Sequence, residues 1–486
     1  MYIWISLASS ADLNALSIHI SPEFNPAGVA KKLASDISGA VKAVLVEKNY
    51  IDKDYRSTYY NYYSKKGLKY RADCIRLHFF DGTVSFDPNT LQLTSSVGGE
   101  ISHHYFGYMV LRPTGNATIG RSVLSPDVRS GATGLIITAD HKVHLLGYKL
   151  TVQGFPSMDQ HRDIAVCAHA ACWSILRHNN KRHSVYSEFL THDITLMAQD
   201  FNPGGIVPSR GLEISHAERV FQEAGTFPFH VARDINNVND PSFYRQLGAY
   251  IESGFPLFAA NHRGGHAMAV VGYEWRAPVV TGVPGMRYAW DEVKSLTVVD
   301  DNYLPYLSIP ITGGTLYSAQ NIDAFIVALP EKVFYPADAV DRLAPTLFRL
   351  PLTGLPPKEN SIVRYFLSTG SGIRRFMRGR ESEFDPAILT AVMKLPFAQF
   401  VWVVEFATEA EWSNGQISAR AIIDATASER ESWPLWLFHT RTQALIFSRE
   451  SVSLDLKTGI GALHLNTPPG QAFSRMDQNL RPTQSK

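Results

Sequence analysis

The sequence predicts an α+β protein with three domains and a polar tail. Its 486 residues are too many for a single hydrophobic core, so two or three domains are expected. Apolar residues make up 45% of the chain and charged residues 19%, which is typical of globular proteins. Both helical and strand-like apolar patterns occur along the chain. We expect α+β domains over residues 1–150 and 345–470 on either side of a central domain over residues 151–335, and a disordered tail over residues 471–486.

The first 150 residues combine one long helical pattern with several strand patterns. Residues 26–47 carry apolar side chains at helical spacing, which predicts an amphipathic helix. Residues 74–80 are strand-like, and the Asp81-Gly82 pair after them predicts a hairpin with residues 84–86. Further strands are expected over residues 105–111 and 134–137.

Residues 53–71 interleave six tyrosines with six lysines and arginines. Such a pattern can bind single-stranded nucleic acid, because bases stack on the rings and phosphates pair with the cations. It is also typical of an amphipathic helix whose tyrosines pack inward while the basic residues face water. The formal net charge of the chain is only +1, which gives no electrostatic argument for a nucleic-acid partner. We therefore favour the packed helix.

Residues 151–335 carry three helix patterns followed by three strand patterns, and the segment after them is rich in proline. Helices are expected over residues 167–178, 213–223 and 241–253, and strands over residues 256–260, 266–275 and 295–300. Prolines recur from Pro330 to Pro357, which indicates a boundary. Strand-like runs over residues 400–406, 419–424 and 435–438 indicate a separate α+β domain.

The cysteine content and the lack of targeting patterns favour a cytoplasmic protein. Three cysteines occur, and this odd, sparse number argues against a disulfide framework and for a reducing compartment. The first residues are apolar but no basic segment precedes them, so a strand is expected there rather than a signal peptide. No stretch approaches the roughly 18 to 20 apolar residues of a membrane span, so no membrane partner is expected.

Cys167 has the surroundings of a nucleophilic thiol. A thiol with the ordinary pKa of about 8.5 is mostly protonated at neutral pH, so a nucleophilic cysteine needs a neighbour that stabilises the thiolate. Residues 164–166 indicate an extended approach and the following alanines favour a helix, which places this thiol among the unpaired N–H groups of a helix start. Cys172 lies about one and a half turns further on and is expected to be a buried apolar side chain.

A histidine and a carboxylate downstream complete the expected catalytic group. His266 begins an apolar strand, and Asp300 ends the next strand. In an antiparallel pair the start of one strand lies beside the end of the following one, so the two side chains can be neighbours. Successive strand residues point to opposite faces, and we favour Asp300 over Asp301 as the orienting residue. His262 is a weaker alternative base, and the long loop over residues 276–294 is expected to rim the cleft.

These motifs, in the order Cys, His, Asp, resemble those of papain-like cysteine peptidases. Residues 167–177 read Cys-Ala-His-Ala-Ala-Cys-Trp-Ser-Ile-Leu-Arg and are similar to the Cys-Gly-Pro-Ala-Ala-Leu-Ala-Met-Val-Leu-Arg helix of the branch that processes bacteriocin leaders. Residues 266–273 are similar to the His-Ala-Val-x-x-Val-Gly-Tyr strand of that family. The resemblance covers residues 153–310 and implies a central papain-like domain, with an N-terminal helix bundle packed on an antiparallel sheet.

The resemblance also implies an oxyanion donor. The family has a glutamine before the nucleophile whose side-chain amide donates to the oxyanion. Gln160 stands seven residues before Cys167, where the family usually shows six, and Ala-His replaces the common Gly-Pro after the cysteine. A second alignment matches the Cys-Trp at Cys172 to the Cys-Trp of the papain helix, but it places Val166 at the donor position, and a valine side chain cannot donate. Cys167 is therefore the favoured nucleophile.

The sequence thus predicts a papain-like cysteine peptidase that acts on a protein or peptide through Cys167, His266 and Asp300, with Gln160 at the oxyanion. Acyl-enzyme chemistry of this kind requires no cofactor and no metal. Amidases, N-acyltransferases and transglutaminases use the same triad, and a non-catalytic papain-like scaffold is a further alternative. The flanking domains are expected to present or restrict substrate, or to bind a protein partner.

A zinc site is the remaining alternative, because five potential ligands cluster in one segment: His161, Cys167, His169, Cys172 and His178. Cys167 and His169 would lie about 200° apart around a helix of about 3.6 residues per turn, so they cannot share a face. No nearby Cys-x-x-Cys or histidine pair completes four ligands. The zinc hypothesis is therefore not favoured.

Overall fold

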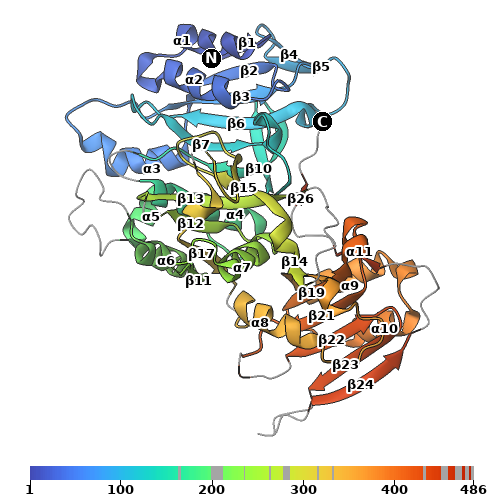
Figure 1. Cartoon of the computed structure of the whole chain (residues 1–486). Coiled ribbons are helices and arrows are strands. Elements are labelled where there is room, and N and C mark those ends of the chain that lie inside the picture. Colours follow the sequence, from blue (N-terminus) through green and yellow to red (C-terminus); the bar gives the residue numbers. More distant parts are fainter. Residues whose placement is uncertain are drawn as a thin grey trace.

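The chain is a mixed α/β protein in which three large β-sheets follow one another (Figure 1). The computed structural model describes residues 1–161, 166–198, 212–234, 236–261, 264–276, 285–314, 317–330, 333–428, 430, 434–449, 458–465, 473–476 and 481–482. The described pairings of the first and central sheets are antiparallel, and the third sheet has one parallel pair, between β14 (Arg287–Tyr288) and β18 (Ser361–Thr369). The α+β class predicted from the sequence is confirmed.

The first sheet has seven strands in the order β1-β2-β3-β6-β7-β10-β9. Their bounds are β1 Tyr2–Ser6, β2 Ala43–Tyr50, β3 Cys74–Phe80, β6 Tyr105–Leu111, β7 Ile119–Leu124, β9 Ala139–Leu145 and β10 Tyr148–Ser157. Apolar clusters cover both faces of the sheet, and helices α2 (Pro26–Asp36) and α3 (Lys53–Asn61) contribute to one cluster each. Because β10 continues to Ser157, this sheet leads directly into the segment that carries the candidate site.

The helix predicted over residues 26–47 is too long, because α2 ends at Asp36. Asn25 caps the start of α2 by accepting the Gly28 N–H at 3.2 Å, and the residue after Asp36 is extended. Residues 43–46 are buried without interruption and form the start of β2. A short continuous run of apolar residues is typical of a strand that is covered on both faces. The prediction instead assigned this run to the end of the preceding helix.

The hairpin predicted over residues 74–86 is wrong in its pairing. β3 has its predicted bounds but pairs with β2 and β6, while β4 (Val84–Asp87) pairs with β5 (Gln92–Ser95). All seven residues of β3 are buried, so long strands on both sides suit it better than the short, partly exposed β4.

The tyrosine-rich segment folds as α3 and a short 3-10 turn, and only some of its rings pack inward. Tyr55 and Tyr63 are buried with their ring centroids 5.8 Å apart, whereas Tyr60 is exposed and lies beneath the Arg56 guanidinium at 5.1 Å. The expected inward packing therefore holds for part of the segment, and the cation–π contact occupies one of the exposed rings.

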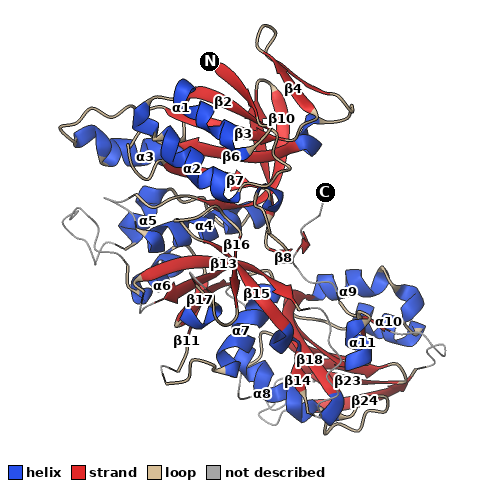
Figure 2. Cartoon of the chain, turned by 45° about the horizontal axis from the view of Figure 1, so that its top comes forward, coloured by secondary structure: helices blue, strands red, loops and turns tan. Residues whose placement is uncertain are grey.

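The central sheet has the order β11-β17-β12-β13-β15-β16, with β8 paired beside β13. Its strands are β8 Leu135–Ile136, β11 Phe227–Ala232, β12 Leu257–Asn261, β13 His266–Trp275, β15 Val293–Val299, β16 Leu307–Pro310 and β17 Ala324–Leu329. The helices packed around it are α4 Cys167–Arg182, α5 Thr191–Met197, α6 Ile214–Glu223 and α7 Pro241–Glu252 (Figure 2). The predicted helix starts at Cys167 and Pro241 and both bounds of β13 are confirmed.

The loop between β13 and β15 does not rim the candidate site in its described part. It leaves β13 after Trp275, at the opposite end of the strand from His266. Its residues 287–288 pair with β18 of the third sheet. A hairpin loop lies at the closed end of its two strands, whereas His266 and Asp300 lie at the open end, so the predicted position is wrong for the described part of the loop, and residues 277–284 lie outside the described residues.

The third sheet has the order β14-β18-β19-β21-β22-β23-β24. Its further elements are β19 Phe400–Thr408, β21 Ala419–Asp424, β22 Leu435–Thr440, β23 Gln443–Arg449 and β24 Thr458–His464, with helices α8 Ala337–Leu347, α9 Gly370–Arg378, α10 Pro386–Lys394 and α11 Glu409–Ser413. The proline-rich boundary thus contains α8, with Pro345 inside it. One hydrophobic cluster runs from the central sheet into the third sheet, so these two parts share packing.

Part of the predicted disordered tail is ordered. Phe473–Ser474 pairs with β20 (Gln416–Ile417), and Arg481–Pro482 pairs with β8 of the central sheet. Phe473 is fully buried, which supplies the apolar contact that the polar composition of the tail concealed.

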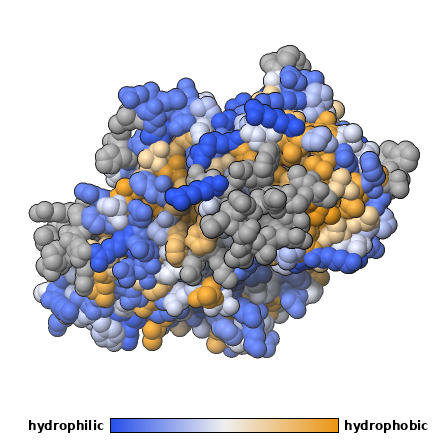
Figure 3. All heavy atoms as spheres, turned by 90° about the horizontal axis from the view of Figure 1, so that it is seen from below, coloured by the Kyte–Doolittle hydropathy of each residue, from blue (hydrophilic) through white to orange (hydrophobic). Residues whose placement is uncertain are grey.

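Among the described residues no helix has the length and apolar content needed to cross a membrane. The face drawn in Figure 3 interleaves hydrophilic side chains with smaller hydrophobic areas.

Candidate active site

Cys167 is the first residue of α4, where its neighbours shape the start of the helix. Val166 is extended, and its N–H donates to Nδ1 of His169 at 3.3 Å. Burial lowers the pKa of His169 to about 4, so the neutral ring can accept this bond. His169 therefore caps the helix at the position where the papain-like motif has proline.

The two cysteines of α4 lie in different surroundings. Cys167 is partly exposed and free, among the first N–H groups of the helix. Cys172 is fully buried, and burial together with the charge of Cys167 raises the pKa of its thiol. A buried neutral thiol is a poor nucleophile, so Cys172 has the expected character of an apolar core residue.

Helix α3 holds α4 in place through a buried carboxylate. Asp54 of α3 accepts from Trp173 Nε1 at 2.9 Å and from Arg177 at 2.8 Å, and all three side chains are buried. Burial raises the pKa of Asp54 to about 6, against the lowering effect of the Arg177 charge. The helix that carries the candidate nucleophile is therefore fixed by residues more than a hundred positions earlier in the chain.

His266 begins β13 directly after a glycine turn. Gly265 has a φ of +60°, a conformation that residues with a side chain rarely adopt. A Cβ on Gly264 would lie 2.6 Å from the Asn261 side chain, which accepts the Gly264 N–H at 2.9 Å. The two glycines thus let the chain turn tightly between β12 and β13, and they leave the His266 side chain 12% exposed at the strand end.

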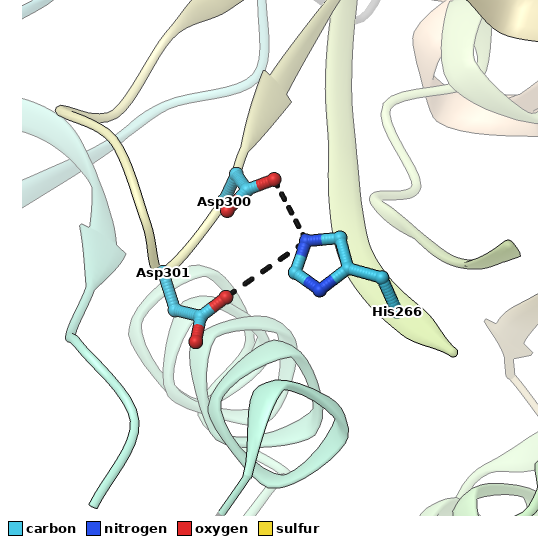
Figure 4. A group of neighbouring side chains, drawn as sticks. All are labelled: His266, Asp300 and Asp301. Atoms are coloured by element: carbon cyan, nitrogen blue, oxygen red, sulfur yellow. Dashed lines mark hydrogen bonds and ion pairs between the residues drawn. The ribbon is translucent and has the colours of Figure 1, made fainter. Parts of the chain in front are cut away.

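The antiparallel register brings Asp300 to His266. Ala269 pairs with Val299 at the end of β15, so the next residue lies beside the start of β13. His266 Nε2 lies 2.8 Å from Asp300 Oδ2 and 3.9 Å from Asp301 Oδ1 (Figure 4). Asp300 is therefore the hydrogen-bond partner, as favoured from strand alternation, and Asp301 lies at ion-pair distance only.

The charges of this group favour a protonated imidazole. Burial would lower the pKa of His266, but its hydrogen bonds to Asp300 and Cys167 and their charges raise it to about 10. Nε2 is engaged by Asp300, so Nδ1, which points away from both carboxylates in Figure 4, is the nitrogen left for Cys167. Burial and the charge of Asp300 raise the pKa of Asp301 to about 7.

Tyr317 is a site residue that the sequence did not indicate. Its ring stacks on the His266 ring with 5.7 Å between centroids and 13° between planes. Tyr303 meets Tyr317 edge to face at 6.4 Å. Burial and the nearby carboxylates raise the pKa of Tyr317 to about 12, so it stays neutral and holds the imidazole plane from one side. No spacing or motif in the sequence marks this residue.

Gln160 is not joined to the other predicted site residues by any described contact. It follows β10, and its backbone carbonyl accepts from Arg112 at 3.5 Å. Within the described part of the chain, no hydrogen bond links its side-chain amide to Cys167 or His266. Residues 162–165, which connect it to α4, and His262, the alternative base, lie outside the described residues.

The five residues of the zinc alternative do not converge. His161 contacts Tyr63 and Arg112, His169 accepts from the backbone, and His178 stacks on Phe155 with 4.9 Å between centroids. In the described segments, the three ligand-type side chains that lie close together are instead His266, Asp300 and Asp301, with one atom of each within 4.8 Å of the others. The 2.8 Å distance between the imidazole of His266 and the carboxylate of Asp300 is that of a hydrogen bond. We therefore assign these residues as a hydrogen-bonded pair and not as metal ligands.

Comparison of the chain with models of known protein families gives no match, and comparison with curated proteins gives none either. The case for a function therefore rests on the hydrogen bond between His266 and Asp300 and on the position of Cys167 at the start of α4.

Proposed function

We propose that the protein is a cysteine-dependent hydrolase, a peptidase of papain-like type. The observation that carries the proposal is the position of His266, whose Nε2 lies 2.8 Å from Asp300 Oδ2, and Cys167 is among the groups that raise the pKa of this imidazole. A thiol at a helix start, a base whose pKa responds to that thiol and an acceptor behind the base are the parts of a triad.

The proposed reaction begins from a Cys167 thiolate and a protonated His266. The sulfur forms a bond to the carbonyl carbon of the substrate, and Asp300 stabilises the imidazolium. His266 gives its Nδ1 proton to the leaving amine as the C–N bond breaks, which leaves an acyl-enzyme. Water then attacks the thioester, His266 takes a proton from that water, and the acid is released while the thiolate re-forms. The Cys167 N–H is suited to the oxyanion, and losing one such donor typically costs on the order of 100-fold in rate.

The arrangement of elements supports the papain-like assignment. α4, which carries the nucleophile, packs against the central antiparallel sheet, and that sheet carries both the base and the orienting carboxylate. The Gln160 amide as oxyanion donor remains part of this proposal. The three described cysteines are free, which suits a reducing compartment such as the cytoplasm.

A peptide-library digest tests the proposal. The wild-type protein is expected to generate new peptide termini, whereas Cys167→Ala does not and Cys172→Ala does. A primary amine added as a competing acceptor separates hydrolysis from acyl transfer, because transfer would attach the amine to the new C-terminus. Equal cleavage by the wild type and Cys167→Ala would contradict the proposal. If neither the wild type nor a variant cleaves a peptide of the library, the result would favour the scaffold alternative.

A further inference from the structure

Lys32 connects the N-terminal domain to the candidate site. It lies on α2, and its side chain is 18% exposed. Its Nζ donates to Asp159 Oδ1 at 2.6 Å and to the carbonyl oxygen of Asp301 at 3.0 Å. Asp301 directly follows the residue that accepts from His266, so one ammonium group holds the turn that presents this acceptor.

The segment after Asp301 rests on the same domain at two further points. Arg129 donates to the Leu304 carbonyl, and the Tyr306 hydroxyl donates to the Leu124 carbonyl at 2.6 Å. β15 ends at Val299, so the residues beyond it have left the central sheet. Their position is therefore set in part by the N-terminal domain.

Lys32 also contributes charge where three carboxylates gather. Burial and the charge of Asp300 raise the pKa of Asp159, while Lys32 lowers it. A cavity of about 10 Å³, lined by Lys32, Asp159 and Asp300 among others, lies between them, and its volume suits a single water. The titratable groups that face this region are Lys32, Arg112, Asp159, Asp300, Asp301, His266, Cys167, Tyr303 and Tyr317.

We propose that Lys32 is a positioning residue of the candidate site: it fixes the Asp300–Asp301 turn, so the N-terminal domain completes the site instead of only presenting substrate. This inference rests on the proposed function. Without the ammonium group the turn loses a donor, and the negative charge beside the thiol is less balanced. Loss of the donor loosens the acceptor of His266, and loss of the positive charge makes the Cys167 thiolate less favourable.

Alkylation of Cys167 by iodoacetamide, followed by peptide mass spectrometry across pH, tests this inference without a known substrate. Lys32→Met is expected to move the midpoint of the alkylation profile to higher pH. At pH values below both midpoints, alkylation then slows roughly tenfold for each pH unit by which the midpoint moves, because the thiolate fraction falls in that proportion. Lys32→Arg keeps a charged donor and is expected to restore most of the rate. Lys31→Met removes the same charge from the exposed neighbouring residue and is expected to behave like wild type.

Thermal unfolding of each variant separates positioning from general destabilisation. A merely structural role would lower the melting temperature of Lys32→Met without moving its alkylation midpoint, and that result would overturn the inference. If Lys32→Met does not fold, Lys32→Gln and the conservative arginine variant provide the same comparison. If wild-type Cys167 itself titrates like an ordinary thiol, the proposed function fails and this inference fails with it. A wild type that is alkylated at low pH together with an identical Lys32→Met profile would refute the inference alone.

Discussion

Asp300→Asn is expected to destabilise the protein in a pH-dependent way. The amide oxygen can still accept from His266, so the substitution removes charge and little shape. The pKa of His266 is raised to about 10, compared with an ordinary value of about 6.5, and a difference of one in pKa corresponds to about 1.4 kcal/mol. The full difference in pKa therefore sets an upper limit of about 5 kcal/mol on the stabilisation of the folded protein by the protonated His266. Asp300 and Cys167 both contribute to this stabilisation. We expect the loss of the Asp300 charge to cost about 2 to 3 kcal/mol.

The sign of the effect follows from the directions in which the two pKa values move. A histidine with a raised folded pKa contributes stability that is complete below about pH 6.5 and is lost as the pH rises through about 10. Asp300, with a lowered pKa, contributes stability above about pH 4 that is lost at lower pH. The destabilisation by Asp300→Asn is therefore expected to be largest between about pH 4 and 6.5 and small above about pH 10.

Urea unfolding of wild type, Asp300→Asn and Asp301→Asn at about pH 5.5, 8 and 10.5 measures this difference. Asp301 is the matched control, because burial and the charge of Asp300 raise its pKa to about 7, so its ionised form is unfavourable. Asp301→Asn is expected to become relatively more stable than wild type as the pH rises from about 4 through 7. A loss in Asp300→Asn that is the same at all three pH values would refute the proposed pairing of His266 with Asp300.

Three further outcomes are expected. Asp54→Ala removes the buried acceptor of Trp173 and Arg177 and is expected to cost about 3 kcal/mol or more in urea unfolding, and a loss under about 1 kcal/mol would show that α4 does not depend on α3. Glu405→Gln removes the carboxylate between two buried arginines of the third sheet and is expected to lower the unfolding free energy by about 3 to 5 kcal/mol, whereas an unchanged midpoint would contradict the role of that ion cluster. Cys172→Ala is expected to cost about 1 to 2 kcal/mol and to leave Cys167 alkylation unchanged, so slowed alkylation would implicate the second thiol.

Local patterns in the sequence predicted the elements that carry the site. The alanine-rich segment after Cys167 forms a helix at the expected residue, and β13 has both predicted bounds, because each pattern matches the period of its element. The adjacency of His266 and Asp300 follows from antiparallel pairing of consecutive strands, which needs no long-range information.

Contacts between distant segments were beyond such patterns. Lys32 lies 269 residues before the carbonyl that it binds, and Asp54 lies 123 residues before Arg177. Tyr317 reaches His266 from a loop, where no periodicity marks a side chain. The merged helix over residues 26–47 and the mispaired hairpin over residues 74–86 have the same cause: local hydrophobicity does not specify which strand becomes a neighbour.

The ultraviolet absorbance of the thiolate at about pH 6 tests the central claim most directly, because a cysteine with an ordinary pKa of about 8.5 is almost fully protonated there. We predict one thiolate in the wild type and in Cys172→Ala, and its loss in both Cys167→Ala and His266→Ala. Absence of thiolate from the wild type, or its persistence after His266→Ala, would contradict an ion pair between Cys167 and His266.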